Sequence, residues 1–349
     1  MTEIVTGLAM LGYRELDHAL GVRPRLVSNV TEEHFDRLTE AREADRYGEE
    51  FETAWANGQR FAYSEEGLRG RPPWFLEWKG PHRPPSYEQI PADLRIDHVY
   101  LISCKYGSDI LMNASPSHLF ERLLADRRSS GANDWYATIA PAAYQELWAA
   151  CRRAIADSSS APAPGGEAPP TAGPEPALDS LPELATDVTP ADRKAMKNFL
   201  RPRAWPSDEA AEAYRWLAVD VSNQSAKRWK EQLDKDPEDM LWRLLRFAPS
   251  PYFVLGRSSD GRPLHYRVAT PWDFRERFEL KAFDAWGDAV GQPLVRWRAE
   301  IRSTATGELA SVDGHVEVRW SHGRFGGMPE AKIYLDTPHH RVPGYFVLK

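Results

Sequence analysis

Residues 99–105 read Val-Tyr-Leu-Ile-Ser-Cys-Lys, and this run constrains the fold more than any other part of the chain. Its apolar, β-branched and aromatic side chains predict a buried strand. The run ends at Lys105, whose ammonium is costly to bury unless it reaches water or an anion. Asp93 and Asp97 lie a few residues earlier. We therefore expect a core strand that ends beside acidic side chains.

Strand geometry distinguishes Asp93 from Asp97 as the possible partner of Lys105. On a single extended strand, the step from Asp97 to Lys105 would span about 26 Å, too far for both side chains to share an ion. A hairpin that turns at residues 97–98 would instead place Asp93 opposite residue 102, close to Lys105. The sequence thus favours Asp93 as the acidic partner of the lysine and keeps Asp97 as the alternative.

The order of predicted elements around this strand resembles a known nuclease family. A helix with acids over residues 31–55 is followed by a strand, an aspartate-bearing strand, the strand that ends in x-x-Lys, and a helix over 115–124 that begins at the N-cap Ser115. In this order the chain resembles the restriction-endonuclease-like nucleases, the PD-(D/E)XK superfamily. The resemblance covers mainly residues 31–125, and reaches Gly256 if a linker interrupts one domain.

The resemblance implies an α/β fold with a mixed central sheet flanked by helices, followed here by a β-rich C-terminal region. It implies an endonuclease that uses Mg²⁺ (or Mn²⁺) to cut DNA, with defence against foreign DNA as a fitting role. The family's helix acid corresponds to Glu50 or its neighbour Glu49. The family's aspartate corresponds to Asp93 or Asp97, and its lysine to Lys105.

The chain departs from the family at Ser103, where the family usually has Glu or Asp. A hydroxyl cannot hold a divalent ion as a carboxylate does. Some members of the family carry this acid on the following helix, and Glu121 is placed for that role. Lys105 would orient the attacking water or steady charge on the scissile phosphate. The candidate metal ligands that the resemblance implies are Glu50, Asp93, Asp97 and Glu121.

The same residues also allow a structural interpretation. The lysine would then be the end of a strand that leaves the core, with its ammonium in water, and the acids of residues 49–52 would be the solvated face of a helix. The corresponding function is a catalytically inactive nuclease-fold subunit that binds nucleic acid or protein partners. Convergence of Asp93 and Glu121 on Lys105 would distinguish the two.

Other motif-like features have plainer explanations. Residues 329–332 read Pro-Glu-Ala-Lys, with Asp313 upstream, but the apolar run follows this lysine, which favours a charge pair at a strand start. The C-terminal histidines lack a third zinc ligand at convincing spacing. Cys104 is better explained as a small buried hydrophobe than as a nucleophile.

A predicted long hairpin near the C-terminus interleaves arginine with tryptophan. Such a mixture suits phosphate contacts and base stacking, and it also suits a two-sided strand with Trp inward and Arg outward. Residues 193–349 carry 26 Lys and Arg against 21 Asp and Glu, which is only a weak basic excess. Both interpretations stay open for Arg296, Arg298, Arg302, Arg319, Trp320 and Arg324.

Composition divides the chain into three parts. Residues 1–155 would form the nuclease-like α/β domain, 156–190 a flexible Pro/Ala/Ser/Gly linker or insertion, and 191–349 a helical and then β-rich domain that binds substrate or a protein partner. The net charge of −7 argues against indiscriminate binding of nucleic acid. Two cysteines exclude a disulfide framework. Without a signal-peptide pattern or an apolar run long enough to span a bilayer, we expect a cytoplasmic protein that does not interact with membranes.

Overall fold

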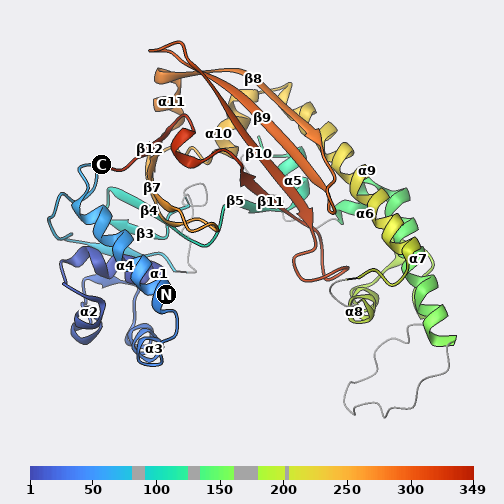
Figure 1. The fold of residues 1–349 in the computed structure, drawn as a ribbon, viewed down its shortest axis with the longest axis horizontal. Coiled ribbons are helices and arrows are strands. Elements are labelled where there is room, and N and C mark those ends of the chain that lie inside the picture. Colours follow the sequence, from blue (N-terminus) through green and yellow to red (C-terminus); the bar gives the residue numbers. More distant parts are fainter. Residues whose placement is uncertain (81–90, 125–133, 161–179, 201–203) are drawn as a thin grey trace.

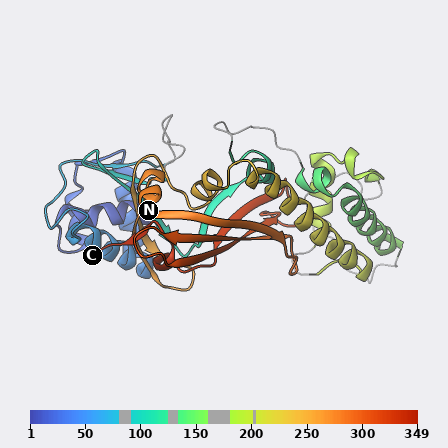
Figure 2. The same cartoon turned by 90° about the horizontal axis from the view of Figure 1, so that it is seen from above.

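A computed structural model describes residues 1–80, 91–124, 134–160, 180–200 and 204–349. The chain forms an elongated body with two sheets (Figure 1). The N-terminal helices lie at one end and helices α7 (Pro141–Ser160) and α9 (Asp208–Leu233) at the other, as the view from above also shows (Figure 2). The fold is mixed α/β with helices flanking a mixed sheet, in agreement with the predicted class.

The first sheet has seven strands in the order β1-β2-β3-β4-β6-β7-β12. It is mixed, because β4 runs parallel to β6 whereas β2-β3-β4 form an antiparallel meander. Its strands are β1 (Val27–Ser28), β2 (Leu76–Trp78), β3 (Leu94–Ile96), β4 (Tyr100–Tyr106), β6 (Tyr252–Arg257), β7 (Pro263–Val268) and β12 (Tyr345–Val347).

Helices α1 (Thr2–Leu8) and α4 (Gly48–Tyr63) cover one face of this sheet, with α2 (Leu16–Val22) and α3 (Glu32–Glu43) outside them. Gly58 allows α1 and α4 to cross closely, because a Cβ there would lie 2.1 Å from the Thr6 carbonyl oxygen. The predicted single helix over residues 31–55 is wrong. It is broken between α3 and α4, where Asp45 and Tyr47 adopt left-handed φ values of 49° and 63°.

The second sheet has five antiparallel strands, and α9 packs against one face of it. Val295, Trp297, Ala299 and Ile301 alternate along one strand and are fully buried. The predicted long hairpin is confirmed by the pairing of β9 with β10. In spatial order the strands are β5 (Ile110–Ala114), β11 (Glu330–Leu335), β10 (Leu309–Arg319), β9 (Leu294–Ser303) and β8 (Phe278–Gly287).

Shorter helices join these layers. Helix α5 begins as expected, with Pro116 at its first position and the Ser115 hydroxyl accepting a hydrogen bond from the His118 N–H. A larger apolar cluster continues from the second face of the first sheet to the second sheet. The remaining helices are α5 (Pro116–Glu121), α6 (Trp135–Ile139), α8 (Pro190–Phe199), α10 (Pro237–Leu244), α11 (Pro271–Arg277) and the 3₁₀ turns Ala9–Leu11, Ala185–Asp187 and His339–Arg341.

Both sheets combine strands from the two predicted domains. The first sheet takes β6, β7 and β12 from residues 191–349, and the second takes β5 from residues 1–155. Of the predicted linker 156–190, residues 161–179 lie outside the described part of the chain. Its ends are ordered: α7 continues to Ser160, and Trp148 Nε1 donates to the Pro182 carbonyl oxygen at 2.9 Å.

In the described part of the chain, no helix is both long and apolar enough to cross a membrane.

Candidate functional site

The predicted hairpin between β3 and β4 is present. Asp97 and His98 form its turn with φ values of 48° and 62°, and the Val99 N–H donates to the Ile96 carbonyl at 3.1 Å. The register differs by one residue from the predicted one, because it is Leu94 that pairs with Ile102. Asp93 therefore lies immediately before β3, beside Ser103 and Cys104.

The Asp93 carboxylate binds the end of β4 directly. Its Oδ2 accepts hydrogen bonds from the Cys104 N–H at 2.7 Å and from the Ser103 hydroxyl at 3.5 Å. Lys105 follows on the same strand and is half-buried. Because side chains alternate along a strand, Ser103 and Lys105 project from one face of the sheet. The structure thus brings Asp93 to the strand end that carries the lysine.

Gly256 makes this strand end possible. It pairs with Lys105 across the parallel β4–β6 ladder. A Cβ at this position would lie 1.8 Å from the Lys105 carbonyl oxygen and 2.6 Å from its carbonyl carbon. Only a residue without a side chain allows the two backbones to approach this closely.

A charged cluster at β2 and β3, with Lys79 just after β2, adjoins Asp93. Its only signal in the sequence is the alternation of residues 76–79, Leu-Glu-Trp-Lys. Lys79 is 5% exposed, and its Nζ lies 3.0 Å from Glu77 Oε2. Arg95 Nε lies 2.8 Å from the same oxygen. Burial raises the pKa of Glu77, but Lys79 and Arg95 together outweigh it and hold that pKa below its usual value. The Lys79 N–H donates to the Asp93 carbonyl at 2.8 Å, so the cluster and the aspartate form one unit.

Glu3 on α1 is a second carboxylate near this strand end. Its Oε2 accepts a hydrogen bond from Trp78 Nε1 at 2.5 Å. Burial raises the pKa of the Cys104 thiol well above its usual value, and the charges of Asp93 and Glu3 raise it further. The charges of Asp93 and Glu3 therefore both act on the Cys104 sulfur. The raised pKa also keeps Cys104 protonated, which is opposite to what a thiol nucleophile needs.

Asp97 has a structural role at the hairpin turn. It accepts hydrogen bonds from Arg71 Nη1 at 2.6 Å and from the Trp74 and Phe75 N–H groups at 2.7 and 3.0 Å. Burial raises the pKa of Asp97, but these donors outweigh it, so the pKa is lower than usual. Since the turn and Lys105 lie at opposite ends of β4, Asp97 stands apart from Asp93.

The two predicted helix acids lie elsewhere. Glu50 is exposed in the first turn of α4, and its neighbour Glu49 forms an ion pair with Arg257. Glu121 ends α5, which packs on α9, and its Oε1 lies 3.8 Å from Arg228 Nε. In the part of the chain that is described, no three His, Cys, Asp or Glu side chains group closely enough to hold a metal ion.

Four of the five arginines proposed for nucleic acid are paired with acids on or beside the second sheet. Arg298 Nε lies 2.6 Å from Asp313 Oδ1, and Arg319 Nη1 lies 3.0 Å from Glu317 Oε2. The other ion pairs join Arg296 to Asp288 and Asp336, and Arg302 to Glu279. Outward arginines on this face are therefore largely neutralised by their neighbours.

The aromatic part of that pattern is buried or paired as well. Trp320 packs edge-on against Tyr136, with ring centroids 4.8 Å apart, at the edge of the core. Arg324 lies over the Trp205 ring at 3.8 Å and donates to the Ala204 carbonyl. Trp320 is half-buried, and its contacts with Tyr136 and Phe325 already cover part of the ring.

The second Glu-x-Lys motif forms a charge pair at the start of β11. Lys332 Nζ lies 3.9 Å from Glu330 Oε2. The hydroxyl of Ser321 donates to the same oxygen, which lowers the pKa of Glu330. This arrangement agrees with the structural interpretation of residues 329–332.

Comparison of the chain with known protein families, with curated proteins and with solved structures finds no match.

Proposed function

We propose that this chain is a metal-dependent phosphodiesterase that acts on DNA through Asp93 and Lys105. The observation that carries the proposal is the contact of the Asp93 carboxylate with Ser103 and Cys104, immediately before Lys105 on β4. This is the pairing of aspartate strand and lysine strand that the nuclease resemblance calls for. The meander β2-β3-β4 beside a parallel β6 agrees with that resemblance too.

The residues at the end of β4 suit a divalent metal ion that is coordinated partly by the substrate. Magnesium is commonly bound through one or two carboxylates together with substrate phosphates, without a closed protein cage. Asp93 supplies one carboxylate at the end of β4.

When bound, a divalent ion lowers the pKa of a coordinated water and stabilises charge on a phosphoryl oxygen. The protein itself positions the Asp93 carboxylate and Lys105. The hydrogen bond from the Cys104 N–H fixes the Asp93 carboxylate, and the close β4–β6 pairing at Gly256 fixes the backbone of Lys105. From there the Lys105 ammonium would steady negative charge on the scissile phosphate.

A second candidate is a catalytically inactive protein of the same architecture that binds nucleic acid or a protein partner. The observation that favours it is the position of Glu121, which pairs with Arg228 on α9 instead of meeting Lys105. Binding through residues 191–349, a cytoplasmic location and a role in defence are further expectations of either proposal.

A plasmid-cleavage assay with Mg²⁺ or Mn²⁺ against EDTA tests the first proposal. Wild-type protein should nick or cut DNA only with the metal, and Lys105→Ala and Asp93→Asn should abolish cleavage. Glu121→Gln is the matched control, because it removes an acid outside the proposed site and should leave the rate unchanged. Metal-dependent cleavage that survives in Lys105→Ala would refute the site. DNA binding without cleavage by wild-type protein, under either metal, would support the inactive alternative.

A further inference from the structure

A pocket of about 470 Å³ lies between the first sheet and the N-terminal helices α1 and α3, in the blue part of Figure 1. Its walls come from Met1 and Ile4 at α1, from one face of α3, from the turn between α3 and α4, and from Trp78 on β2. This volume falls within the range of about 300–1,000 Å³ that is typical of small-molecule sites. The proposed cleavage uses none of the residues that line it.

Helix α3 contributes a continuous stripe of side chains to this pocket. The stripe consists of His34, Arg37, Glu40 and Ala41, whose spacing of three and four residues places them on one face of the helix. The His34 ring contacts the Trp78 ring, with centroids 4.9 Å apart. This contact joins α3 to β2 and closes one side of the pocket.

Trp78 forms a fixed wall of the pocket. Its Nε1 donates to Glu3 Oε2 at 2.5 Å, and its ring packs against His34. Gly80 lies close to the same ring, since a Cβ at that position would be 3.3 Å from it. These contacts hold the indole in one orientation, so Trp78 bounds the pocket and leaves stacking on a ligand to another ring.

Tyr47 supplies that ring, in the turn between α3 and α4. The residue is 54% exposed, and its φ of 63° is the left-handed conformation that bulky side chains rarely adopt. Backbone conformations of this kind are costly and cluster at ligand sites. The Phe51 ring one turn later is tilted against Tyr47, with centroids 6.3 Å apart. The turn therefore presents a half-exposed aromatic ring at the pocket.

Two side chains of opposite charge line the same end of the pocket. Glu40 and Arg46 form no ion pair and no side-chain hydrogen bond within the described part of the chain. The Arg46 N–H donates to the Ala41 carbonyl at 2.8 Å, and the Ala44 N–H donates to the Glu40 carbonyl at 3.1 Å. These bonds fold the turn back onto the end of α3. Glu40, Arg46 and Tyr47 therefore start from neighbouring backbone positions.

We propose that this pocket binds a nucleobase, with Tyr47 stacked on the base and with Glu40 and Arg46 hydrogen-bonded to its edge. Every base has a flat face that stacks on an aromatic ring. The edge of a base carries both donors and acceptors, which a carboxylate and a guanidinium satisfy together. A simple anion would be repelled by Glu40 and a simple cation by Arg46. The remaining cation of the α3 stripe, Arg37, is neutralised by Glu33, with 2.5 Å between Nη2 and Oε1.

The pocket adjoins the strand end that carries Asp93. Trp78 pairs with Leu94 across β2 and β3, and the Lys79 N–H donates to the Asp93 carbonyl at 2.8 Å. Paired strands lie about 5 Å apart, so the Trp78 wall is one strand away from this aspartate. A base next to the scissile phosphate of the DNA substrate is therefore the occupant that fits, and this identification rests on the proposed function. A free nucleoside or nucleotide supplies the same base chemistry.

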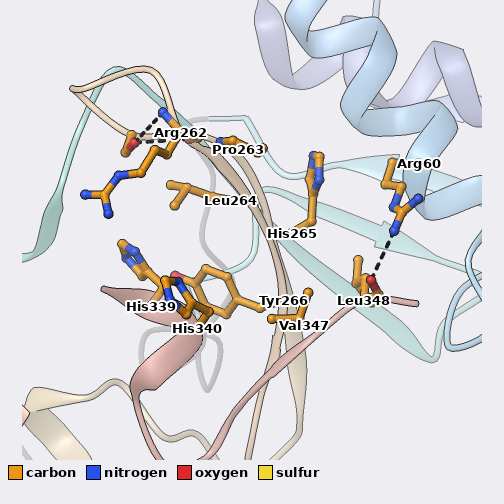
Figure 3. Close-up of a pocket in the computed structure, with 11 residues that line it drawn as sticks. Arg60, Arg262, Pro263, Leu264, His265, Tyr266, His339, His340, Val347 and Leu348 are labelled. Atoms are coloured by element: carbon orange, nitrogen blue, oxygen red, sulfur yellow. Dashed lines mark hydrogen bonds between the residues drawn. The ribbon is translucent and has the colours of Figure 1, made fainter. Parts of the chain in front are cut away.

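A smaller cavity of about 210 Å³ beside β7 does not group its charges in this way (Figure 3). Arg60 and Arg262 lie on opposite sides of it, with Leu264 and His265 between them. Arg262 is also paired with Asp260, whose Oδ2 lies 2.6 Å from the arginine Nε. Arg262 is therefore a suitable control position, because it is an exposed arginine beside a different cavity.

Fluorescence titration of the full chain without metal tests the proposal. The probes are the deoxyriboside of 2-aminopurine, a fluorescent base whose emission falls when it stacks, and a single-stranded oligonucleotide that contains one such base. Wild-type protein should quench both probes saturably. Tyr47→Ala should weaken binding about 5- to 160-fold, because stacking of a base on an aromatic ring contributes on this order, and Tyr47→Phe should restore it. Tyr63→Ala, at the exposed last residue of α4, is the matched control and should bind as wild type does.

A second pair of variants tests the edge of the base. Arg46 is exposed, so Arg46→Gln should fold normally and still bind both probes more weakly, whereas Arg262→Gln should bind them as wild type does. If Tyr47→Ala does not fold, Arg46→Gln decides the question alone. An oligonucleotide that binds more tightly than the free deoxyriboside identifies DNA as the occupant, and equal affinity identifies a free nucleoside or nucleotide.

The proposal is overturned if folded wild-type protein quenches neither probe. It is also overturned if folded Tyr47→Ala or Arg46→Gln binds both probes as tightly as wild type does. Because the titration contains no metal, its result is separate from that of the cleavage assay. A protein that binds the base but cuts no DNA would support the pocket and refute only the nuclease activity.

Discussion

Gly256→Ala is expected to damage both the stability of the protein and the position of Lys105. The added Cβ would lie 1.8 Å from the Lys105 carbonyl oxygen, whereas real Cβ contacts essentially never fall below 3.0 Å. The two backbones would therefore have to separate by about 1.2 Å, the difference between these distances. Because the atoms that clash are backbone atoms of paired strands, no side-chain rotation can relieve the contact.

The size of the effect follows from overpacking. One extra methyl group in a packed site costs about 1–3 kcal/mol. Each kcal/mol lowers the melting temperature of a mid-sized domain by roughly 2–4 °C, so a fall of about 2–12 °C is expected. A displacement of about 1 Å at a catalytic group can reduce the rate about 100-fold. If Lys105 acts at the phosphate as proposed, DNA cleavage should fall by about that factor.

Differential scanning calorimetry and the cleavage assay measure these two effects. Gly21→Ala is the matched control, because a Cβ at that helical position has no atom within 4 Å. It should leave the melting temperature unchanged or raise it slightly, since alanine favours helices more than glycine. A Gly256→Ala protein that melts and cleaves as wild type does would refute the account of the β4–β6 contact.

Three further outcomes are expected. Asp97→Asn should lower the melting temperature because it weakens the pairing with Arg71, and it should leave metal-dependent cleavage unchanged. Loss of cleavage in a folded Asp97→Asn protein would instead indicate that Asp97 is a metal ligand. The thiols of Cys104 and Cys151 should resist labelling by Ellman's reagent at pH 8 in the folded protein. Burial raises the pKa of Cys151 to about 12 and that of Cys104 well above its usual value, so neither forms much thiolate. Rapid labelling without unfolding would contradict this. The free energy of unfolding should fall as pH rises above about 10. Tyrosines of the unfolded chain lose their protons there, whereas buried tyrosines such as Tyr252, whose pKa is raised by burial, retain theirs in the folded protein. A melting temperature that stays unchanged between pH 9 and 11 would contradict this.

Local patterns predicted the local structure well. The turn at residues 97–98 and the pairing of β9 with β10 in a long hairpin both follow from alternation and turn chemistry over a few residues. The Asp93 contact with the end of β4 depends on that turn, so it was predictable apart from a shift of one residue.

The failures concern contacts between distant segments. Glu121 was expected near Lys105 because the resemblance allows the missing acid to lie on the following helix. However, β5 leaves the first sheet and pairs with β11, more than 200 residues later. Nothing in the sequence near β5 indicates that this strand joins the second sheet. The ion pair of Arg298 with Asp313 likewise depends on the β9–β10 register, which periodicity alone does not fix. Glu3 was missed because only the packing of α1 on the sheet brings it near Cys104.

Anomalous scattering from Mn²⁺ is the most direct test of the proposed active site. Crystals of the protein grown with a short DNA duplex would be soaked in Mn²⁺ and measured near the manganese absorption edge. The account predicts a peak at coordination distance from the Asp93 carboxylate, with the Lys105 ammonium beside the nearest DNA phosphate. A peak at Glu50, Asp97 or Glu121 without Asp93, or bound DNA with no ion at Asp93, would contradict it.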